Sequence, residues 1–468
     1  MRSAALLIFF VSIYCCIGDP YNPPETDPNY RWHACDEIIE KREVNNKPIP
    51  STSGDSQQRH PILLVPGYSG TSLDISRDGT ENDSNDECLE YADMGRLWLN
   101  WKFLSPLRSS EFVNCFFRLF SLQVSVINGS ISYSPQVRGV KVKPSHDVGE
   151  GERGGTDAVD ELVKVFGGGV GGYMNSLITS LEGRGYTRGV DLFAAPYDWR
   201  VSPDFLFESM GYREKMTRLV EDMYKSSGKR VVLISHSMGN LHTLRFLNEM
   251  SGEWKDKFIE HYFSIAAPWA GVPNTVKDIL SGDLILKGWY AEYVKLFDRD
   301  RAQNFGSLVF MNPPLSIWQS TTLVRFQDGS NFTTSQLPYL YELSCTSPSP
   351  SIIRKSVEKS IDRLSPPLVE TTCMLGYGVN TERYWEYKDA VSTSHGWADI
   401  IGCGDGDGTV SIESNAIARY WEREYGEVNG GREVEVREYY GRDHLGMVSD
   451  EEVLGDITAK LSIINGRS

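Results

Sequence analysis

Apolar runs alternate with helix-like repeats along most of this chain, most clearly between Arg230 and Leu247. Val231–Ile234 is a short apolar run of mainly β-branched residues, which is typical of a buried strand. Beyond it, leucines recur at three-residue spacing, as on one face of a helix: Leu241, Leu244 and Leu247. The pattern predicts a strand that passes through a tight turn, Ser235–Gly239, into a helix.

The same alternation continues on both sides of this unit. Further strands are predicted at His60–Val65, Val190–Ala194, Ile259–Ala266, Val369–Val379 and Glu433–Tyr439. Helices are predicted at Tyr173–Leu181, Tyr212–Tyr224, from near Ile412, and at Asp450–Ile463. Strands that alternate with helices indicate a mainly parallel α/β sheet. The alternation fails over residues 272–366, where we expect an inserted cap.

The N-terminal region carries a different pattern. Arg2 precedes an apolar stretch from Ala4 to Ile17, and small residues follow before Asp19. This predicts a signal peptide of residues 1–18, with an uncleaved membrane anchor as the alternative. Residues 19–59 are polar with several prolines, which indicates an extended arm. The α/β domain is expected over residues 60–468.

Composition narrows the class of protein. The chain has 468 residues, of which 40% are hydrophobic and 24% charged, as in globular proteins. The formal net charge of −16 argues against nucleic acid as a partner. It also argues against binding driven by anionic lipid headgroups. A neutral or zwitterionic lipid surface is compatible with this charge.

The predicted secretory route permits disulfides and glycans. The chain has 8 cysteines, and without Cys15 and Cys16 of the signal six remain: Cys35, Cys88, Cys115, Cys345, Cys373 and Cys403. An even number suits a set of disulfides. Glycosylation sequons begin at Asn82, Asn128 and Asn331.

The turn Ser235–Gly239 has the setting of a nucleophile elbow, which lifts one side chain above the carboxyl edge of a sheet. Ser237 is the candidate nucleophile, with small residues two positions before and after it. The alternative is an ordinary turn in which Ser237 caps the helix. An elbow would make the Met238 amide one oxyanion donor. Tyr68, in a glycine-bounded loop after the first strand, is our candidate for the second, and a plain turn is the alternative there.

The chain also offers a base and an orienting carboxylate. Of the 8 histidines, only His444 lies late in the chain, in a polar turn between a predicted strand and a helix. Asp407 lies in an acidic turn before it, which gives the chain order Ser, Asp, His of α/β hydrolases. Imidazole activates a serine hydroxyl, and a carboxylate orients the imidazole. Asp405 and His395 are the alternatives.

No metal or organic cofactor is predicted. The acidic turn Gly404–Val410 resembles the start of a calcium loop, but Val410 and Ala416 stand where that loop needs Gly and Glu. A glycine cluster before Tyr173 lacks the Lys-Ser/Thr of a phosphate-binding loop.

Several motifs together resemble the lecithin:cholesterol acyltransferase family, which includes lysosomal phospholipase A2 and plant and protist relatives. They are His60–Gly67, Ala194–Arg200, Ser235–Gly239, Ala267–Gly271, Gly406–Val410 and His444–Val448. The similarity extends from His60 to Ile464. Two departures stand out: Ser235 replaces a frequent Gly, and Tyr68 differs from the residues that relatives carry.

The resemblance implies an α/β-hydrolase fold in which Ser237, Asp407 and His444 form a catalytic triad. It implies that an acyl chain passes from a phospholipid to the serine, and then to an alcohol such as a sterol or diacylglycerol, or to water. A pure phospholipase A is the alternative, and an inactive lipid-binding relative a third. The expected partners are phospholipid, a lipid acceptor and a membrane or lipoprotein surface. The expected compartment is secreted or lumenal, including lysosome or vacuole.

The resemblance also implies two disulfides and a membrane-binding subdomain. Cys88 and Cys115 match the family's small disulfide-closed subdomain, here residues 85–118. A second bridge is expected at Cys373–Cys403, with Cys345 and Cys35 as competitors. Large apolar side chains crowd the segment between Cys88 and Cys115, and we expect four of them to dock on lipid: Trp98, Trp101, Phe103 and Leu104. The alternative is that they belong to the core.

Overall fold

A computed structural model describes residues 59–466, with gaps at 80–85, 99–108, 161–163, 166–167, 170–171, 283–298, 319, 358–364, 391–392, 394–397 and 425–427. It also describes residues 41, 44, 46 and 49. Several predictions fall outside the described residues: the signal peptide, most of the arm, Cys35, Asn82, Trp101, Phe103, Leu104 and His395. Within the described part, no helix has both the length and the apolar character that a membrane span requires.

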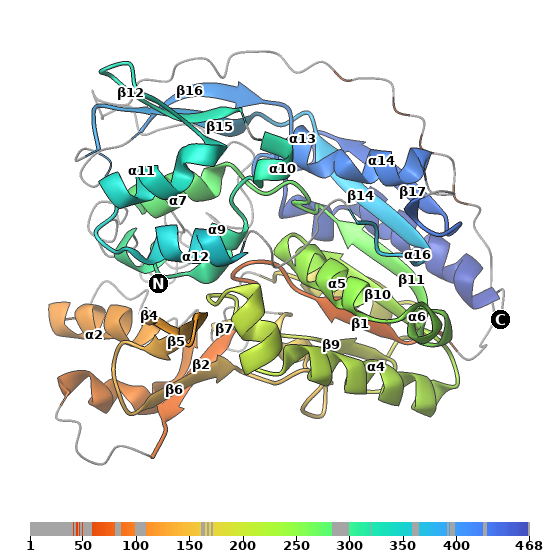
Figure 1. The fold of residues 1–468 in the computed structure, drawn as a ribbon. Helices are drawn as coiled ribbons and strands as arrows, with labels where there is room; N and C mark the ends of the chain where they lie inside the picture. The colour runs from red at the N-terminus through yellow and green to blue at the C-terminus, as the bar shows by residue number, and fades with distance from the viewer. Residues whose placement is uncertain are drawn as a thin grey trace, which may run out of the picture.

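A six-stranded parallel sheet forms the centre of the fold (Figure 1). In spatial order its strands are β9 (Leu192–Ala194), β1 (Ile62–Val65), β10 (Val231–His236), β11 (Ile259–Ile265), β14 (Thr371–Tyr377) and β17 (Val434–Tyr440). Every neighbouring pair runs parallel. All six predicted strands are therefore present, and the predicted α/β-hydrolase fold is confirmed.

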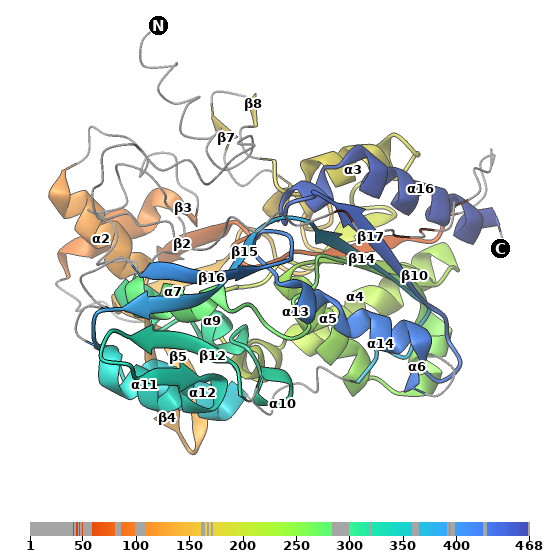
Figure 2. The same cartoon turned by 90° about the horizontal axis from the view of Figure 1, so that it is seen from above.

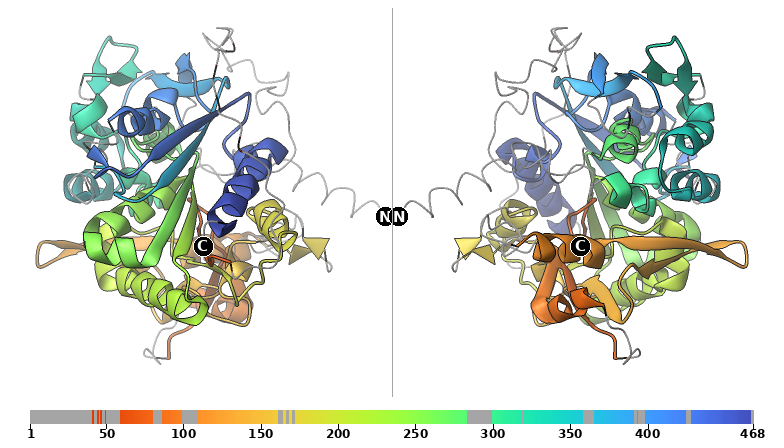
Figure 3. Two further views of the ribbon diagram at one scale, coloured as in Figure 1. Left: turned by 90° about the vertical axis from the view of Figure 1, so that its right-hand side faces the viewer. Right: turned by 90° about the vertical axis from the view of Figure 1, so that its left-hand side faces the viewer.

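Alternate side chains of each strand belong to two separate apolar cores, because successive residues point to opposite faces of a sheet. In β1, Leu63 and Val65 pack in one core, and Ile62 and Leu64 pack in the other. The first face is covered by α4 (Tyr212–Ser227), α5 (Met238–Glu249), α6 (Gly252–Phe258) and α14 (Ile417–Arg423). The second is covered by α3 (Asn175–Glu182) and α16 (Glu451–Gly466), as Figure 3 shows. Burial on both faces explains why these strands read as continuous apolar runs.

A second sheet contains two strands of the predicted cap, β12 (Thr322–Phe326) and β13 (Asn331–Thr333), together with two later strands. Its order is β13, β12, β15 (Thr381–Tyr387) and β16 (Asp399–Gly404). The helices of this part are α7 (Asn274–Ser281), α9 (Gly306–Phe310), α10 (Leu315–Trp318), α11 (Leu337–Ser344) and α12 (Ser349–Val357), and Figure 2 shows them beside the second sheet. A buried ion pair of 2.6 Å between Lys277 and Glu382 joins α7 to β15. Because β15 and β16 follow residue 366, we propose that residues 381–404 belong to the cap as well.

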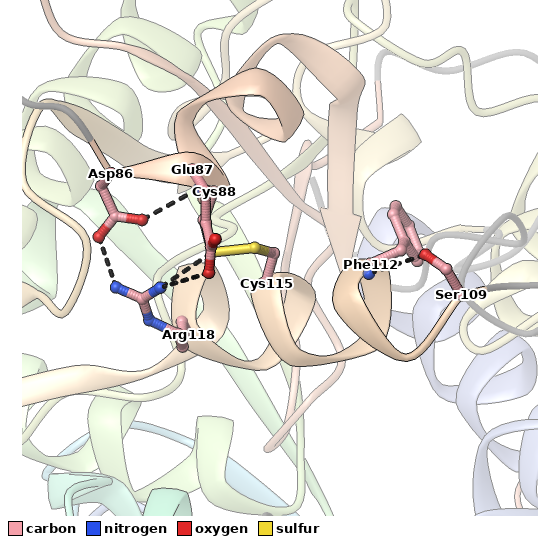
Figure 4. The surroundings of a disulfide bond; sticks show 7 residues. All are labelled: Asp86, Glu87, Cys88, Ser109, Phe112, Cys115 and Arg118. Atoms are coloured by element: carbon pink, nitrogen blue, oxygen red, sulfur yellow. Dashed lines mark hydrogen bonds and ion pairs between the residues drawn. A yellow bond between two sulfur atoms is a disulfide. The ribbon is translucent and has the colours of Figure 1, made fainter.

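Residues 86–98 and 109–118 form a small subdomain closed by the Cys88–Cys115 disulfide (Figure 4), which confirms that predicted pairing. The bond joins η1 (Glu87–Met94) to α2 (Ser110–Phe120). Arg118 pairs with Asp86 beside the disulfide, and the Ser109 hydroxyl caps α2. The remaining strand, β3 (Gly95–Trp98), pairs with β2 (Leu73–Arg77), which pairs in turn with β6 (Val140–Pro144). These pairings connect the subdomain to β2, the strand that follows β1 in the chain.

A two-stranded hairpin projects from the body of the protein (Figure 3). It consists of β4 (Leu122–Ile127) and β5 (Ser130–Pro135). Asn128 and Gly129 form its tip with φ of 52° and 81°. Two positive φ values in a two-residue turn are the requirement of a type I′ hairpin, for which Asn-Gly is the favoured sequence. The Asn128 side chain, a predicted glycan acceptor, is exposed.

Short remaining elements are η2 (Thr156–Ala158), β7 (Lys164–Val165), β8 (Gly168–Gly169), η3 (Phe205–Ser209), η4 (Thr334–Gln336), α13 (Ile412–Asn415) and η6 (Gly446–Val448).

The prediction that Trp98 is a lipid anchor is wrong. Trp98 ends β3 facing the body of the protein and is only 7% exposed. Its ring stacks on Phe120 at 5.3 Å between centroids and meets Trp199 edge-on at 5.1 Å. Its indole Nε1–H donates a hydrogen bond of 2.9 Å to the Ser69 carbonyl. Pairing of β3 with β2 turns this side chain inward, and sequence spacing alone does not reveal that direction.

Trp98→Ala should lower the free energy of unfolding by about 3–5 kcal/mol, the usual cost of truncating a buried Trp. Trp98→Phe keeps a ring and should lower it less. We expect hydrolysis of a soluble ester and binding to liposomes to fall together in Trp98→Ala, in step with the folded fraction. Urea unfolding measures the stability. A stable Trp98→Ala protein that loses only liposome binding would restore the anchor role.

The predicted Cys373–Cys403 disulfide is also wrong. Cys373 lies in the middle of β14, is 2% exposed and is a free thiol. Cys403 lies on β16 and is disulfide-bonded, but not to Cys373 or Cys345, both of which are free. The two strands belong to different sheets, so the two side chains do not meet.

Cys373 should resist alkylation by iodoacetamide at pH 8 in the native protein and react after denaturation. Burial raises the pKa of the Cys373 thiol, so the reactive thiolate is scarce and shielded. Mass spectrometry of peptides from non-reduced protein provides the measurement. Recovery of a Cys373–Cys403 linked peptide would contradict the structure.

Candidate active site

Ser237 occupies a strained turn between β10 and α5. Its φ and ψ are 53° and −130°, an uncommon region for a residue with a side chain. The surroundings hold it there. The Ser237 N–H donates to the Ile265 carbonyl at 3.0 Å. The Asn240 side-chain amide donates to the carbonyls of Ser237 at 3.0 Å and Ile265 at 2.9 Å. This is the geometry of a nucleophile elbow.

Small residues allow the elbow to approach the loop after β1. A Cβ on Gly239 would lie 2.4 Å from the Pro66 carbonyl oxygen, and a Cβ on Gly67 would lie 2.8 Å from Ser237 Cβ. Neither space accepts a side chain. At the other small position, Ser235 is fully buried, and its hydroxyl lies 2.8 Å from the Thr243 hydroxyl. That hydrogen bond satisfies a buried hydroxyl at this position.

The structure brings Ser237, His444 and Asp407 into one hydrogen-bonded series. His444 Nε2 lies 2.8 Å from Ser237 Oγ, and His444 Nδ1 lies 2.8 Å from Asp407 Oδ2. Because the carboxylate accepts, Nδ1 carries the hydrogen, which leaves Nε2 to accept the serine O–H. Asp407 is completely buried, and its other oxygen accepts the N–H groups of Thr409 at 3.0 Å and Val410 at 2.7 Å. Ser237 and His444 are 8% and 7% exposed, so the series is nearly closed to solvent and its carboxylate end is completely closed.

The competing carboxylate has a different position. Asp405 Oδ1 accepts the Gly378 N–H at 2.7 Å, and its carbonyl accepts the Ile412 N–H at 2.8 Å. These bonds shape the turn that carries Asp407. The geometry thus favours Asp407 over Asp405 as the partner of His444.

The loop that carries Tyr68 is held through its backbone by aromatic side chains. Tyr197 O–H donates to the Pro66 carbonyl at 2.7 Å, and Trp199 Nε1–H donates to the Thr71 carbonyl at 3.1 Å. The Trp98 indole holds the Ser69 carbonyl, which lies between Pro66 and Thr71 in the chain. Met238, across the site, is the first residue of α5, where helix geometry leaves the N–H without an intrahelical acceptor. The two proposed oxyanion amides therefore belong to well-anchored segments.

Sequence reasoning missed several residues of this region. Tyr173 and His236 lie against the nucleophile turn, Asn240 holds the backbone of that turn, and Tyr197 holds the loop after β1. The sequence predicts His236 only as a member of the elbow motif and Tyr173 only as the first residue of a helix. The position of a histidine directly before the nucleophile was the one signal available.

The described residues contain one group with the spacing of a metal site, Glu87, Cys88 and Cys115. The disulfide between the two cysteines removes both thiolates, so this group does not suit a metal. A cavity of about 1040 Å³ opens near the amino ends of β1, β10 and β17, lined by charged side chains that include Arg230, Glu260 and Glu433. It lies at the edge of the sheet opposite Ser237.

The strand order, the parallel sheet and the elbow define an α/β-hydrolase fold. A profile of the lecithin:cholesterol acyltransferase family matches residues 94–291. The predicted resemblance to this family is therefore confirmed, and two curated relatives agree.

The chain is 29% identical over 407 residues to a lysosomal phospholipase A and acyltransferase of Rattus norvegicus, covering 85% of this chain and 89% of the relative. It is 28% identical over 419 residues to a phosphatidylcholine-sterol acyltransferase of Mus musculus, covering 87% and 86%. Among solved structures, a chain of the Tle4-Tli4 complex aligns with a TM-score of 0.45 at 14% identity, covering 87% of this chain and 98% of that one.

Asp407→Asn should reduce kcat on a soluble ester by roughly 10⁴-fold, because an amide places the wrong tautomer of His444 toward the serine. Asp405→Asn, the matched control, should retain far more activity, since Asp405 accepts the Gly378 N–H and supports the turn, whereas Asp407 accepts from His444 Nδ1. Steady-state kinetics on both variants makes the comparison. Equal losses would remove the distinction between the two carboxylates.

Proposed function

We propose that this chain is a serine-dependent lipid acyltransferase and phospholipase. It takes an acyl chain from a phospholipid onto Ser237 and transfers it to an alcohol or to water. The observation that carries the proposal is the hydrogen-bonded series Ser237–His444–Asp407 at the carboxyl edge of the sheet.

The geometry supports a two-step acyl transfer. His444 Nε2 accepts the proton of Ser237 as Oγ attacks the ester carbonyl of the phospholipid. The negative charge on the carbonyl oxygen is stabilised by the amides of Met238 and Tyr68. His444 then returns the proton to the departing alkoxide, which releases a lysophospholipid and leaves an acyl–enzyme. In the second step His444 deprotonates an alcohol or water, which attacks the acyl–enzyme and restores Ser237.

The lipid substrate is inferred from the relatives. Both relatives are named for an acyltransferase activity, one together with phospholipase A and one with a sterol as acceptor. A chain that resembles both to the same degree supports phospholipid as acyl donor, with a sterol, a diacylglycerol or a similar alcohol as acceptor. A pure phospholipase A remains the second candidate, because water can replace the alcohol at the same acyl–enzyme.

The proposed setting is the secretory route and a lipid surface. Asn128 and Asn331 are exposed, as glycan attachment requires. The net charge of −16 favours docking through apolar side chains, and Trp101, Phe103 and Leu104 remain our candidates. We propose a secreted or lumenal protein that binds membranes or lipoproteins peripherally.

Ser237→Ala should abolish both hydrolysis and transfer while the protein stays folded, because both routes share one acyl–enzyme. Loss of a triad member lowers kcat by roughly 10⁴–10⁶-fold. The assay uses labelled phosphatidylcholine liposomes with and without sterol or diacylglycerol, and it separates free fatty acid from new esters. Circular dichroism controls for folding.

The outcomes of this assay separate the candidates. New ester formed only with an acceptor supports the acyltransferase, and fatty acid alone under all conditions supports the pure phospholipase. A fluorophosphonate probe should label Ser237 in the same preparation. Activity that survives in Ser237→Ala would contradict the proposal.

A further inference from the structure

His236 precedes the nucleophile and is buried between two loops of the site. It is 1% exposed, and both of its ring nitrogens have partners. Nδ1 lies 2.6 Å from the Tyr173 hydroxyl, and Nε2 lies 3.0 Å from the backbone carbonyl oxygen of His444. The Tyr173 hydroxyl also lies 2.8 Å from the Gly67 nitrogen. These contacts connect the loop after β1 to the turn that carries His444.

A single set of hydrogen positions satisfies this series. The His444 carbonyl can only accept, so His236 Nε2–H donates to it. The neutral ring then accepts at Nδ1 from the Tyr173 O–H, and the Tyr173 oxygen accepts the Gly67 N–H. Burial lowers the pKa of His236 to about 3, and it raises the pKa of Tyr173 above its usual value. Both shifts favour the neutral forms of the two side chains, which this set of hydrogen positions requires.

The Tyr173 ring also fits closely against the loop. A Cβ on Gly70 would lie 2.4 Å from Tyr173 Cε1, and a Cβ on Gly67 would lie 3.0 Å from the hydroxyl. Only glycine at both positions leaves room for the tyrosine. Because the Gly67 N–H points to Tyr173, it is not the second oxyanion donor, which supports the neighbouring Tyr68 amide in that role.

We propose that Tyr173 and His236 are positioning residues that hold the oxyanion loop and the His444 turn at a fixed separation across Ser237. The inference rests on the proposed function, in which the loop supplies an oxyanion amide and the turn supplies the base. The two segments are far apart in sequence, and the Tyr173–His236 pair links them directly. The hydrogen bonds of the two side chains go to the backbone of the loop and of the His444 turn, and the His236 ring also packs against the His444 imidazole at 4.9 Å between centroids. Both residues therefore act by positioning these groups.

The test is a comparison of an ester with its thionoester in Tyr173→Phe. Sulfur is a weak hydrogen-bond acceptor, so an intact oxyanion hole favours the ester. Displacing one donor should shrink the ester-to-thionoester ratio of kcat/KM. For Tyr173→Phe on a soluble substrate we expect kcat to fall 10- to 100-fold, roughly 1.4–2.7 kcal/mol, at nearly constant KM. The substrate ratio should fall about 10-fold, since removing an oxyanion donor outright costs 10²–10³.

Tyr186→Phe is the matched control. Tyr186 is also buried, and its hydroxyl accepts a hydrogen bond from Asn465 at 3.2 Å, away from the loop. This variant should lose similar stability and keep the wild-type substrate ratio. His236→Leu removes both bonds of the ring and should reduce the ratio at least as much as Tyr173→Phe does, which provides a second route if one variant folds poorly.

Ser237→Ala is measured in the same series so that two failures can be told apart. If Tyr173→Phe keeps the wild-type ratio while Ser237→Ala is inactive, the positioning role is overturned and the proposed function stands. A Tyr173→Phe variant that loses activity only in proportion to its folded fraction, with an unchanged ratio, overturns the positioning role as well. Activity in Ser237→Ala overturns the proposed function itself.

Discussion

The site depends on two backbones that meet without side chains between them. The loop after β1 and the turn after β10 approach so closely that Gly67 and Gly239 have no space for a Cβ. Strands β1 and β10 are neighbours in the sheet, so their carboxyl ends necessarily meet at this edge. Ser237 and the loop that carries Tyr68 take their positions from this contact, and Tyr173 and His236 connect it to the turn that carries His444. Side chains that hold the loop after β1, such as Trp98 and Tyr197, support this contact although they are not candidates for the reaction themselves.

Much of the fold was accessible from sequence because parallel strands buried on both faces leave a strong pattern. Their apolar runs appear whole, and each of the six was found within two or three residues of its bounds. Catalytic candidates were accessible for a related reason. Ser237 and His444 follow the parallel strands β10 and β17, whose carboxyl ends lie at one edge, so these two could be grouped without knowing any distance. Asp407 follows β16 of the second sheet, and only the chain order Ser, Asp, His grouped it with them.

The wrong and the missing predictions have a common physical origin. The sequence pattern does not show which way a side chain points or which distant segment it contacts. An aromatic residue near a disulfide is compatible with either solvent or core, and only the pairing of β3 with β2 turns Trp98 inward. Cys373 and Cys403 belong to different sheets that the sequence does not separate. Tyr173 and His236 are 63 positions apart, and their contact depends on how α3 approaches the sheet. Such contacts between distant segments have no local periodicity.

The hairpin tip has a consequence for the design of a variant without the predicted glycosylation sequon at Asn128. Asn128 is a sequon asparagine and also the first of two residues with positive φ. A change to Gln, the usual choice, places a residue there that adopts this backbone poorly and has lost the short amide that favours it. A variant made this way would lose the sequon and change the conformation of the turn at the same time. Ser130→Ala erases the acceptor motif from the neighbouring strand and leaves both turn residues as they are.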